Sequence, residues 1–232
     1  MVKRVLFTPF DLFSAGKFSD APGEEYIDKN NAWAAQFREL KAAKAQRAPL
    51  PGKVAVREGD TAMALHTVYY KPNRLPSDMM SKLGRDDQVY IRGHCIAGFE
   101  GIFAHSDRDE TGKPMHMVRM NQTLFNMLND RTKPGRREIR FSLDAPTVVQ
   151  RLFESGLKPE FGGWIKCYNC HSAEGEPNFA TAMRDALAAR GYNACGVYGY
   201  KGALSSFYDG DHKTSTEGGR ASEQRVPIRK PS

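Results

Sequence analysis

The segment WIKCYNCHSAEG, residues 164–175, leads from an apolar run into a turn that contains two cysteines and a histidine. The pattern of Gly162–Tyr168 is typical of a short buried strand, and Cys170 follows just beyond its end. Cys167 and Cys170 are three residues apart, with His171 next in the chain. The segment is therefore compatible with half of a zinc site, with a redox dithiol, or with a strand that leads to one nucleophilic thiol.

Other apolar runs place this strand in an alternating order of strands and helices. The predicted strands are Val5–Phe10, Asp87–Gly93 and Asn193–Tyr200, with a shorter one at Lys53–Val56; the predicted helices are Glu24–Ala48, Ala145–Leu157 and the run from the cap Asn178 to Gly191. This order predicts an α/β protein with three layers, in which a mostly parallel sheet has helices on both faces. Functional sites of such sheets form beyond the carboxyl ends of the strands.

Length and composition indicate a single domain over residues 1–232, with a mostly irregular tail from residue 208 to residue 232. Within that tail, the sequence SEQRVPI could pair at a sheet edge. The net charge of +7 is spread along the chain. The densest basic run, Arg131–Arg140, contains no aromatic residue on which the bases of a single strand could stack. We therefore predict no nucleic-acid partner.

No apolar run approaches the roughly 20 residues of a membrane-spanning helix. The N-terminal sequence MVKRVLFTPFDLF is basic at its start, but Pro9 and Asp11 interrupt its apolar part, which argues against a signal peptide. We expect a chain that is cytoplasmic when synthesised, and secretion or translocation without a Sec signal stays open. The sequence does not indicate an oligomeric state.

Two predicted strands end in reactive side chains. Asp87–Gly93 leads into His94 and Cys95, and Gly162–Tyr168 leads into Cys170. If the two strands are neighbours, they lie about 4.8 Å apart, and an imidazole and a thiol meet at one edge of the sheet. His94 could then take the thiol proton or stabilise the thiolate of Cys170.

The sequences VYIRGHC and IKCYNCHSAEG resemble the strand-plus-histidine and strand-plus-nucleophile segments of caspase-like (clan CD) cysteine peptidases. The chain is most similar to the self-cleaving cysteine protease domains of large bacterial toxins, in which a helix like Ala145–Leu157 lies between the two segments. The resemblance covers residues 87–228, whereas residues 1–86 match only in having a strand and a helix. The resemblance implies a single caspase-like domain that is a hydrolase, namely a thiol protease acting on protein or peptide substrates. It also implies a bacterial effector or toxin with a role in virulence.

By this resemblance, Cys170 is the nucleophile, His94 is the catalytic histidine, and the backbone near Gly93 and Cys95 forms the oxyanion hole. Substrate would bind as an extended strand along an open sheet edge near GYKGALSS, Gly199–Ser206. No cofactor is required for this chemistry, but the toxin domains are activated by inositol hexakisphosphate. The resemblance therefore implies such an activator without assigning the residues that bind it.

Three features depart from the family pattern. Cys95 replaces the usual glycine, His171 after the nucleophile is bulkier than usual, and His94 and Cys170 are further apart in sequence than in caspases. The departure at Cys95 supports an alternative, in which the domain is catalytically silent and acts as a binding or adaptor module.

Metal and redox sites are less well supported by the pattern around Cys167 and Cys170. A zinc site would need two more ligands, and only His94, Cys95 or His171 could supply them. A redox dithiol should open a helix, whereas the next predicted helix starts later, at Asn178. We therefore predict no metal, a buried and inert Cys167, and a reactive Cys170.

Overall fold

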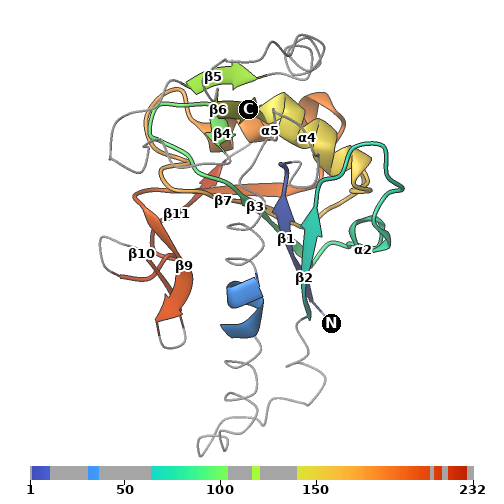
Figure 1. Ribbon diagram of the computed structural model, residues 1–232, viewed down its shortest axis with the longest axis horizontal. Helices are drawn as coiled ribbons and strands as arrows, with labels where there is room; N and C mark the ends of the chain where they lie inside the picture. The colour runs from blue at the N-terminus through green and yellow to red at the C-terminus, as the bar shows by residue number, and fades with distance from the viewer. Residues whose placement is uncertain are drawn as a thin grey trace, which may run out of the picture.

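A six-stranded, mostly parallel sheet forms the centre of the protein (Figure 1). The structure is a computed structural model, and it describes residues 2–10, 31–36, 64–103, 117–120, 140–209, 212–215 and 219–228. In spatial order the strands are β11 (Arg225–Ile228), β8 (Gly196–Tyr200), β7 (Trp164–Tyr168), β3 (Gln88–Arg92), β1 (Lys3–Thr8) and β2 (Ala64–Tyr69). Neighbouring strands are parallel except for β11, which pairs antiparallel with β8. The predicted α/β class with a mostly parallel sheet is thus confirmed.

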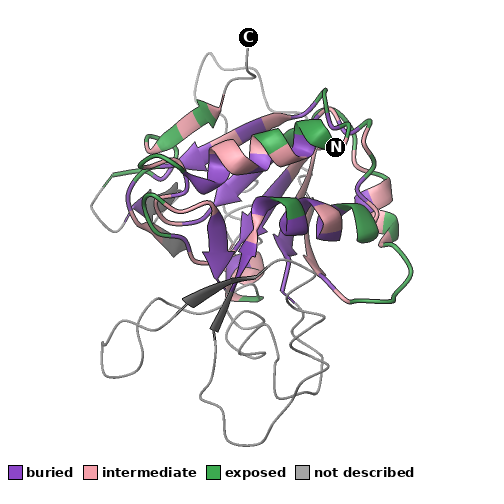
Figure 2. Cartoon of the chain, turned by 90° about the horizontal axis from the view of Figure 1, so that it is seen from above, coloured by how far each residue is buried: buried purple, intermediate pink, exposed green. Residues whose placement is uncertain are grey.

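Helices cover both faces of this sheet. The helices α4 (Ala145–Glu154) and α5 (Phe179–Ala189) lie on one face, and the helical residues 31–36 lie on the other (Figure 1). A short helix, α2 (Asp78–Ser81), follows β2. The central strands β1, β3 and β7 are mostly buried, while α4 and α5 turn buried residues toward the sheet and exposed residues outward (Figure 2). Three layers therefore bury the two faces of the sheet.

The two faces of the sheet differ in chemistry. The face under α4 and α5 is apolar and includes Val89, Ile91, Ile165 and Cys167, none of which is exposed. The opposite face carries an aromatic cluster of Leu6, Trp33, Tyr90, Tyr168, Tyr200 and Ala221. Side chains alternate between the two faces along each strand, so the same strands supply both.

The helices begin where the sequence predicts. The side chain of Asp144 accepts a hydrogen bond from the Thr147 amide at 3.0 Å, and that of Asn178 accepts one from the Thr181 amide at 2.9 Å. Each bond satisfies an amide that the first helical turn leaves unpaired. Gly156 follows α4 with a φ of 103°, which accounts for its position at the end of the helix.

Two smaller sheets were not predicted. The strands β4 (Gly101–Phe103), β6 (Arg140–Asp144) and β5 (Met117–Met120) form one, and β9 (Leu204–Asp209) and β10 (His212–Ser215) form the other. Most of these strands have only three to five residues, so they carry little periodicity. The strand β2 was not predicted either, because the sequence around it shows neither a clear helical pattern nor a clear strand pattern.

The predictions for the C-terminal segment and for the sheet edge need correction. The tail expected to be mostly irregular contains β10 and β11, and the suggested pairing of SEQRVPI at a sheet edge is confirmed by β11. Because β11 pairs with Val197–Tyr200 of β8, that part of the edge is occupied, and an added substrate strand cannot pair with Gly199 and Tyr200 there. The predicted strand at Lys53–Val56, the outer parts of the Glu24–Ala48 helix and most of the basic run Arg131–Arg140 lie outside the described residues.

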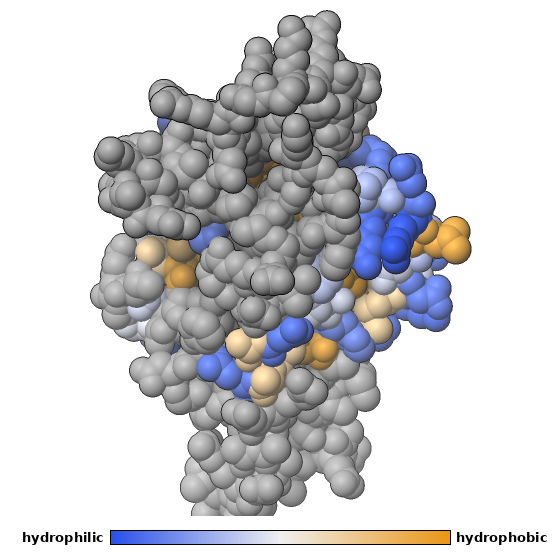
Figure 3. Space-filling model, viewed as in Figure 1, coloured by the Kyte–Doolittle hydropathy of each residue, from blue (hydrophilic) through white to orange (hydrophobic). Residues whose placement is uncertain are grey.

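The described surface on the face drawn in Figure 3 is mainly hydrophilic, with apolar residues in small separate groups. Among the described helices, none has both the length and the apolar character needed to cross a membrane.

Because Gly163 has no side chain, the residue before β7 can lie against the backbone of Asp87, the residue before β3. A Cβ atom at Gly163 would lie 2.3 Å from the Asp87 carbonyl oxygen and 2.6 Å from the Phe161 ring. We expect Gly163→Ala to lower the free energy of unfolding by about 1–3 kcal/mol, as overpacking does. Gly84→Ala is the matched control, because its Cβ would meet nothing nearer than a side-chain oxygen at 3.9 Å. Urea denaturation of both variants tests this, and equal stabilities would contradict the close approach.

Candidate active site

The register of β3 and β7 aligns the two predicted catalytic residues. The strands are adjacent and parallel, and their last paired residues are Arg92 and Tyr168. His94 and Cys170 each follow two residues later, since 94 − 92 and 170 − 168 are equal. The predicted adjacency of the two strands is therefore confirmed, and both residues lie at the carboxyl edge of the sheet.

The two turns stay in contact beyond the ends of the strands. The side-chain amide of Asn169, which is 1% exposed, donates a hydrogen bond to the Gly93 carbonyl oxygen at 2.9 Å. These two residues directly precede Cys170 and His94. His94 is also fixed through its backbone, which exchanges two hydrogen bonds of 2.8 Å with Phe103 of β4. Asn169 was missed in the sequence because nothing in a single sequence marks its partner.

Backbone groups of Leu204 surround the Cys170 sulfur. The Leu204 amide donates a hydrogen bond to Cys170 Sγ at 3.3 Å, and the same sulfur lies 3.9 Å from the Leu204 carbonyl oxygen. An N–H group aimed at sulfur stabilises negative charge there. The first residue of β9 is therefore close to Cys170, and it belongs to the segment Gly199–Ser206 that the resemblance placed near the substrate.

Cys170 differs from the other cysteines in its exposure. Cys95, Cys167 and Cys195 are buried, whereas Cys170 is partly exposed. Burial raises the pKa of the Cys95 thiol to about 12, against a smaller lowering by a backbone hydrogen bond with Ile96 and with a further raising by Cys170. Burial also raises the pKa of Cys167, with a smaller contribution from Cys95. The prediction that Cys167 is buried is confirmed, and it and Cys95 remain protonated at neutral pH.

The two predicted oxyanion residues flank His94 and have different surroundings. A Cβ atom on Gly93 would lie 3.1 Å from Ile102 and 3.3 Å from the Asn169 side chain, so a larger residue would disturb both. The Cys95 side chain packs into the apolar core, with its thiol 3.5 Å from the Ile96 carbonyl oxygen. The core thus accommodates the Cys95 side chain.

Hydrogen bonds fix the turn after β7 to the end of β8. The Ser172 hydroxyl is fully buried, donates to the Cys167 carbonyl oxygen at 2.7 Å and accepts from the Tyr200 amide at 3.0 Å. The His171 amide donates to the Gly202 carbonyl oxygen at 2.8 Å. His171, noted in the sequence as unusually bulky, adopts a left-handed φ of 54° in this turn.

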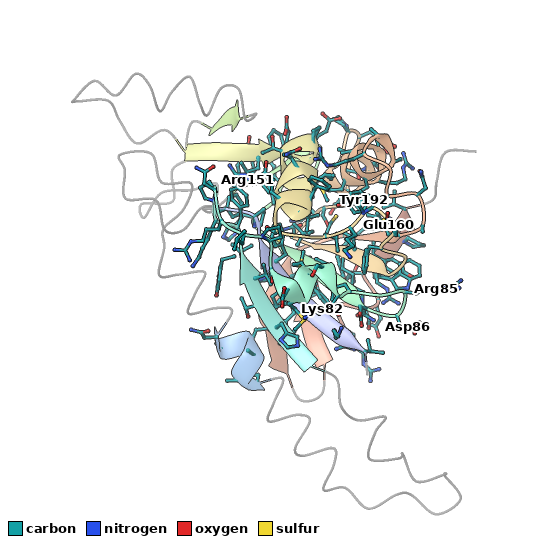
Figure 4. The ribbon with its side chains drawn as sticks, turned by 90° about the vertical axis from the view of Figure 1, so that its right-hand side faces the viewer. Lys82, Arg85, Asp86, Arg151, Glu160 and Tyr192 are labelled. Carbon is teal, nitrogen blue, oxygen red and sulfur yellow. The ribbon has the colours of Figure 1, made fainter. Side chains whose placement is uncertain are left out.

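A groove of about 680 Å³ lies at the opposite, amino end of β7 and β8. Its walls include Trp164, Cys195, Arg184 and the adjacent residues Arg85 and Asp86. Figure 4 shows Arg85 and Asp86 side by side and far from Arg151 on α4. Sites of parallel sheets form at the carboxyl ends of their strands, and Cys170 lies at that end whereas this groove lies at the other.

A buried lysine lies on the aromatic face of the sheet. Lys166 of β7 is 7% exposed, and its ammonium group donates to the Gln88 side chain at 2.8 Å and to the Tyr90 hydroxyl at 3.2 Å. Burial, and then the nearby cations Arg4 and Arg225, lower the pKa of Lys166 to about 7. This face therefore concentrates positive charge around one readily titrated side chain.

Within the described residues, no group of three or more His, Cys, Asp or Glu side chains is arranged to hold a metal ion. Comparison with protein-family models, with curated proteins and with solved structures found no match to this chain. The structure itself defines an α/β protein with a mixed, mostly parallel six-stranded sheet and helices on both faces.

Exposure and pKa predict the order in which the cysteines react. At neutral pH we expect iodoacetamide to label Cys170 at least about tenfold faster than Cys95 or Cys167, because burial keeps those two thiols protonated and inaccessible. Peptide mass spectrometry of the intact folded protein measures each rate, and Cys170→Ala should remove the fast phase. Equal labelling of Cys167 and Cys170 would contradict this assignment.

Proposed function

We propose that the protein is a caspase-like cysteine endopeptidase in which Cys170 is the nucleophile and His94 is the general acid and base. The observation that carries the proposal is the register of β3 and β7, which aligns the two residues at the carboxyl edge of the sheet. The hydrogen bond between Asn169 and Gly93 supports it further, because it joins the two turns one residue before each catalytic position.

The proposed reaction proceeds by acyl transfer. The Cys170 sulfur attacks the carbonyl carbon of the scissile peptide bond, a sulfur–carbon bond forms and the carbon–nitrogen bond breaks. His94 takes the Cys170 thiol proton and delivers it to the leaving amine nitrogen. It then takes a proton from the attacking water and returns it to the sulfur as the carbon–sulfur bond of the thioester breaks, which releases the carboxylic acid product. Backbone amides near Gly93 and Cys95 would stabilise the oxyanion, as the resemblance implies.

The substrate class is a protein or peptide, and the resemblance to toxin domains favours a bacterial effector or toxin module. Cys170 is the partly exposed cysteine, so it is the thiol that a peptide can reach. Because β11 occupies the edge beside β8, substrate would approach the carboxyl ends of the strands, next to Leu204.

The alternative proposal is a catalytically silent binding or adaptor module with the same fold. Its support is Cys95, which stands where the family usually has glycine. The burial of the Cys95 side chain in the core weakens this argument, since the thiol does not need space within the site.

Peptidase activity is tested on a mixture of denatured proteins, because the residue before the cleaved bond is not known. We expect new N-termini with the wild type, none with Cys170→Ala, and a loss of about 10²–10⁴-fold in rate with His94→Ala, which lacks the acid and base. Cys195→Ala is the matched control, because Cys195 lies at the groove at the other end of the sheet. Mass spectrometry of the N-termini is the measurement.

Inositol hexakisphosphate is included in these assays, since the resemblance implies it as an activator. His94→Ala should also slow iodoacetamide labelling of Cys170. If the folded wild type cleaves nothing with or without the polyphosphate, and His94→Ala leaves the labelling rate unchanged, the peptidase proposal fails and the adaptor proposal replaces it.

For the activator, we propose the rim of the cationic aromatic face of the sheet, where Arg225 is exposed and Arg4 is partly exposed. After burial, these two cations are the causes that lower the pKa of the buried Lys166 beneath the rim. A polyphosphate bound there would favour the charged form of Lys166 and would therefore bind best when that form is populated.

Binding of inositol hexakisphosphate should weaken about tenfold in Arg225→Gln, which loses a charge-assisted hydrogen bond of about 1.5 kcal/mol. For the wild type, affinity should fall as the pH rises through about 7, where Lys166 loses its proton, and Lys166→Met should flatten this dependence. Lys158→Gln, an exposed lysine before β7, is the control. Isothermal titration on both sides of that pH measures each affinity, and unchanged binding by Arg225→Gln and Lys166→Met would contradict this location.

A further inference from the structure

Glu174, in the turn that carries Cys170, makes hydrogen bonds to two other turns. The Glu174 carboxylate atom Oε2 accepts a hydrogen bond from the Gly202 amide at 3.0 Å and lies 2.7 Å from Nδ1 of His171. The Glu174 carbonyl oxygen accepts a hydrogen bond from the Gly98 amide at 2.9 Å. One residue thus contacts the segment after β3, the turn after β7 and the turn after β8.

The protonation of this group follows from its partners. The Gly202 amide, and then the His171 side chain, lower the pKa of Glu174, so the carboxylate is ionised at neutral pH. An ionised carboxylate only accepts hydrogen bonds, which means that Nδ1 of His171 carries the proton and donates it. Glu174 therefore holds two donors from different parts of the site on one oxygen.

These bonds reach the Cys170 sulfur through the chain between β8 and β9. Gly202 precedes Leu204 by two residues, and the Leu204 amide donates to Cys170 Sγ at 3.3 Å. The hydrogen bond from the Gly202 amide to Glu174 therefore restrains the backbone two residues before the Leu204 amide. His171, on the other side of Glu174, is the residue next to Cys170.

The contact with the segment after β3 is also close. A Cβ atom on Gly175 would lie 2.6 Å from the Gly98 amide nitrogen, so the two segments touch through glycine. Gly98 lies four residues after His94 in the chain. The same turn that holds the sulfur is therefore attached to the segment that carries the histidine.

We propose that Glu174 is a positioning residue that sets the Leu204 amide against the Cys170 sulfur by binding the Gly202 amide and the His171 ring. A role in catalysis rests on the proposed peptidase function, whereas the positioning of the sulfur does not. Ser172 fixes the base of the same turn independently, through buried bonds to Cys167 and Tyr200. Replacing Glu174 should therefore loosen the site without unfolding the protein.

Hydrogen exchange in the full-length protein, followed by NMR, tests the positioning directly. In Glu174→Ala we expect the Gly202 and Leu204 amides to exchange at least about tenfold faster, because local opening becomes easier. Glu174→Gln should restore slow exchange, since its amide oxygen can accept both hydrogen bonds. Glu176→Gln removes the same negative charge from an exposed residue of the same turn, and its amide exchange rates should match those of the wild type.

Labelling of Cys170 by iodoacetamide gives the second measurement. It should slow at least about fivefold in Glu174→Ala, because the amide that stabilises charge on the sulfur is displaced, and it should recover in Glu174→Gln. The melting temperature should stay within a few degrees of the wild type, which separates this result from general unfolding. Unchanged exchange at Leu204, or unchanged labelling of Cys170, would overturn the inference.

Kinetics separates this inference from the proposed function. With an active wild type, Glu174→Ala should lower kcat and leave KM nearly unchanged, since the defect is in the nucleophile. If the wild type has no peptidase activity but exchange and labelling change as expected, the positioning role stands and only the peptidase proposal fails. If activity is present and the Glu174 variants keep wild-type exchange, labelling and kcat, the positioning role alone fails.

Discussion

The parallel pairing of β3 with β7 is the constraint on which the site depends. Alternation fixes its register, because Val89, Ile91, Ile165 and Cys167 all face the apolar core and are completely buried. A slip of one residue would turn Lys166 into that core, at a high cost for an unpaired cation. The core thus sets the register, and the register sets which residues leave the two strands side by side.

The opposite face of the sheet is built differently. Its aromatic rings pack against Trp33, and the Lys166 ammonium group is buried with hydrogen bonds to Gln88 and Tyr90. Those bonds offset part of the cost of burying the charge, and the nearby Arg4 and Arg225 keep that cost high enough to lower the lysine pKa. The two faces of one sheet therefore differ in charge, because Lys166 and the two arginines gather on this face, whereas the face under α4 and α5 is lined mainly by apolar residues.

The carboxyl edge of the sheet is organised by polar side chains rather than by apolar packing. Asn169 links the turns after β3 and β7, Ser172 links β7 with β8, and Glu174 links all three segments. Short turns have few apolar contacts, so directional hydrogen bonds must fix their shape. The groove at the amino end of the sheet lies away from these fixed turns and from Cys170.

Local periodicity and capping residues were enough to predict the α/β class, the strands β3, β7 and β8, and the helices α4 and α5 with their caps. They also placed Cys170 just past a buried strand. Tertiary structure alone decided that β11 closes the edge beside β8, and that Asn169 reaches Gly93 across 76 residues and Leu204 reaches Cys170 across 34. Such bonds join residues that are distant in the chain, and a single sequence holds no record of which distant groups will meet. Short strands such as β4 were missed for the same reason, since three residues form a strand only when a neighbouring strand is present to pair with them.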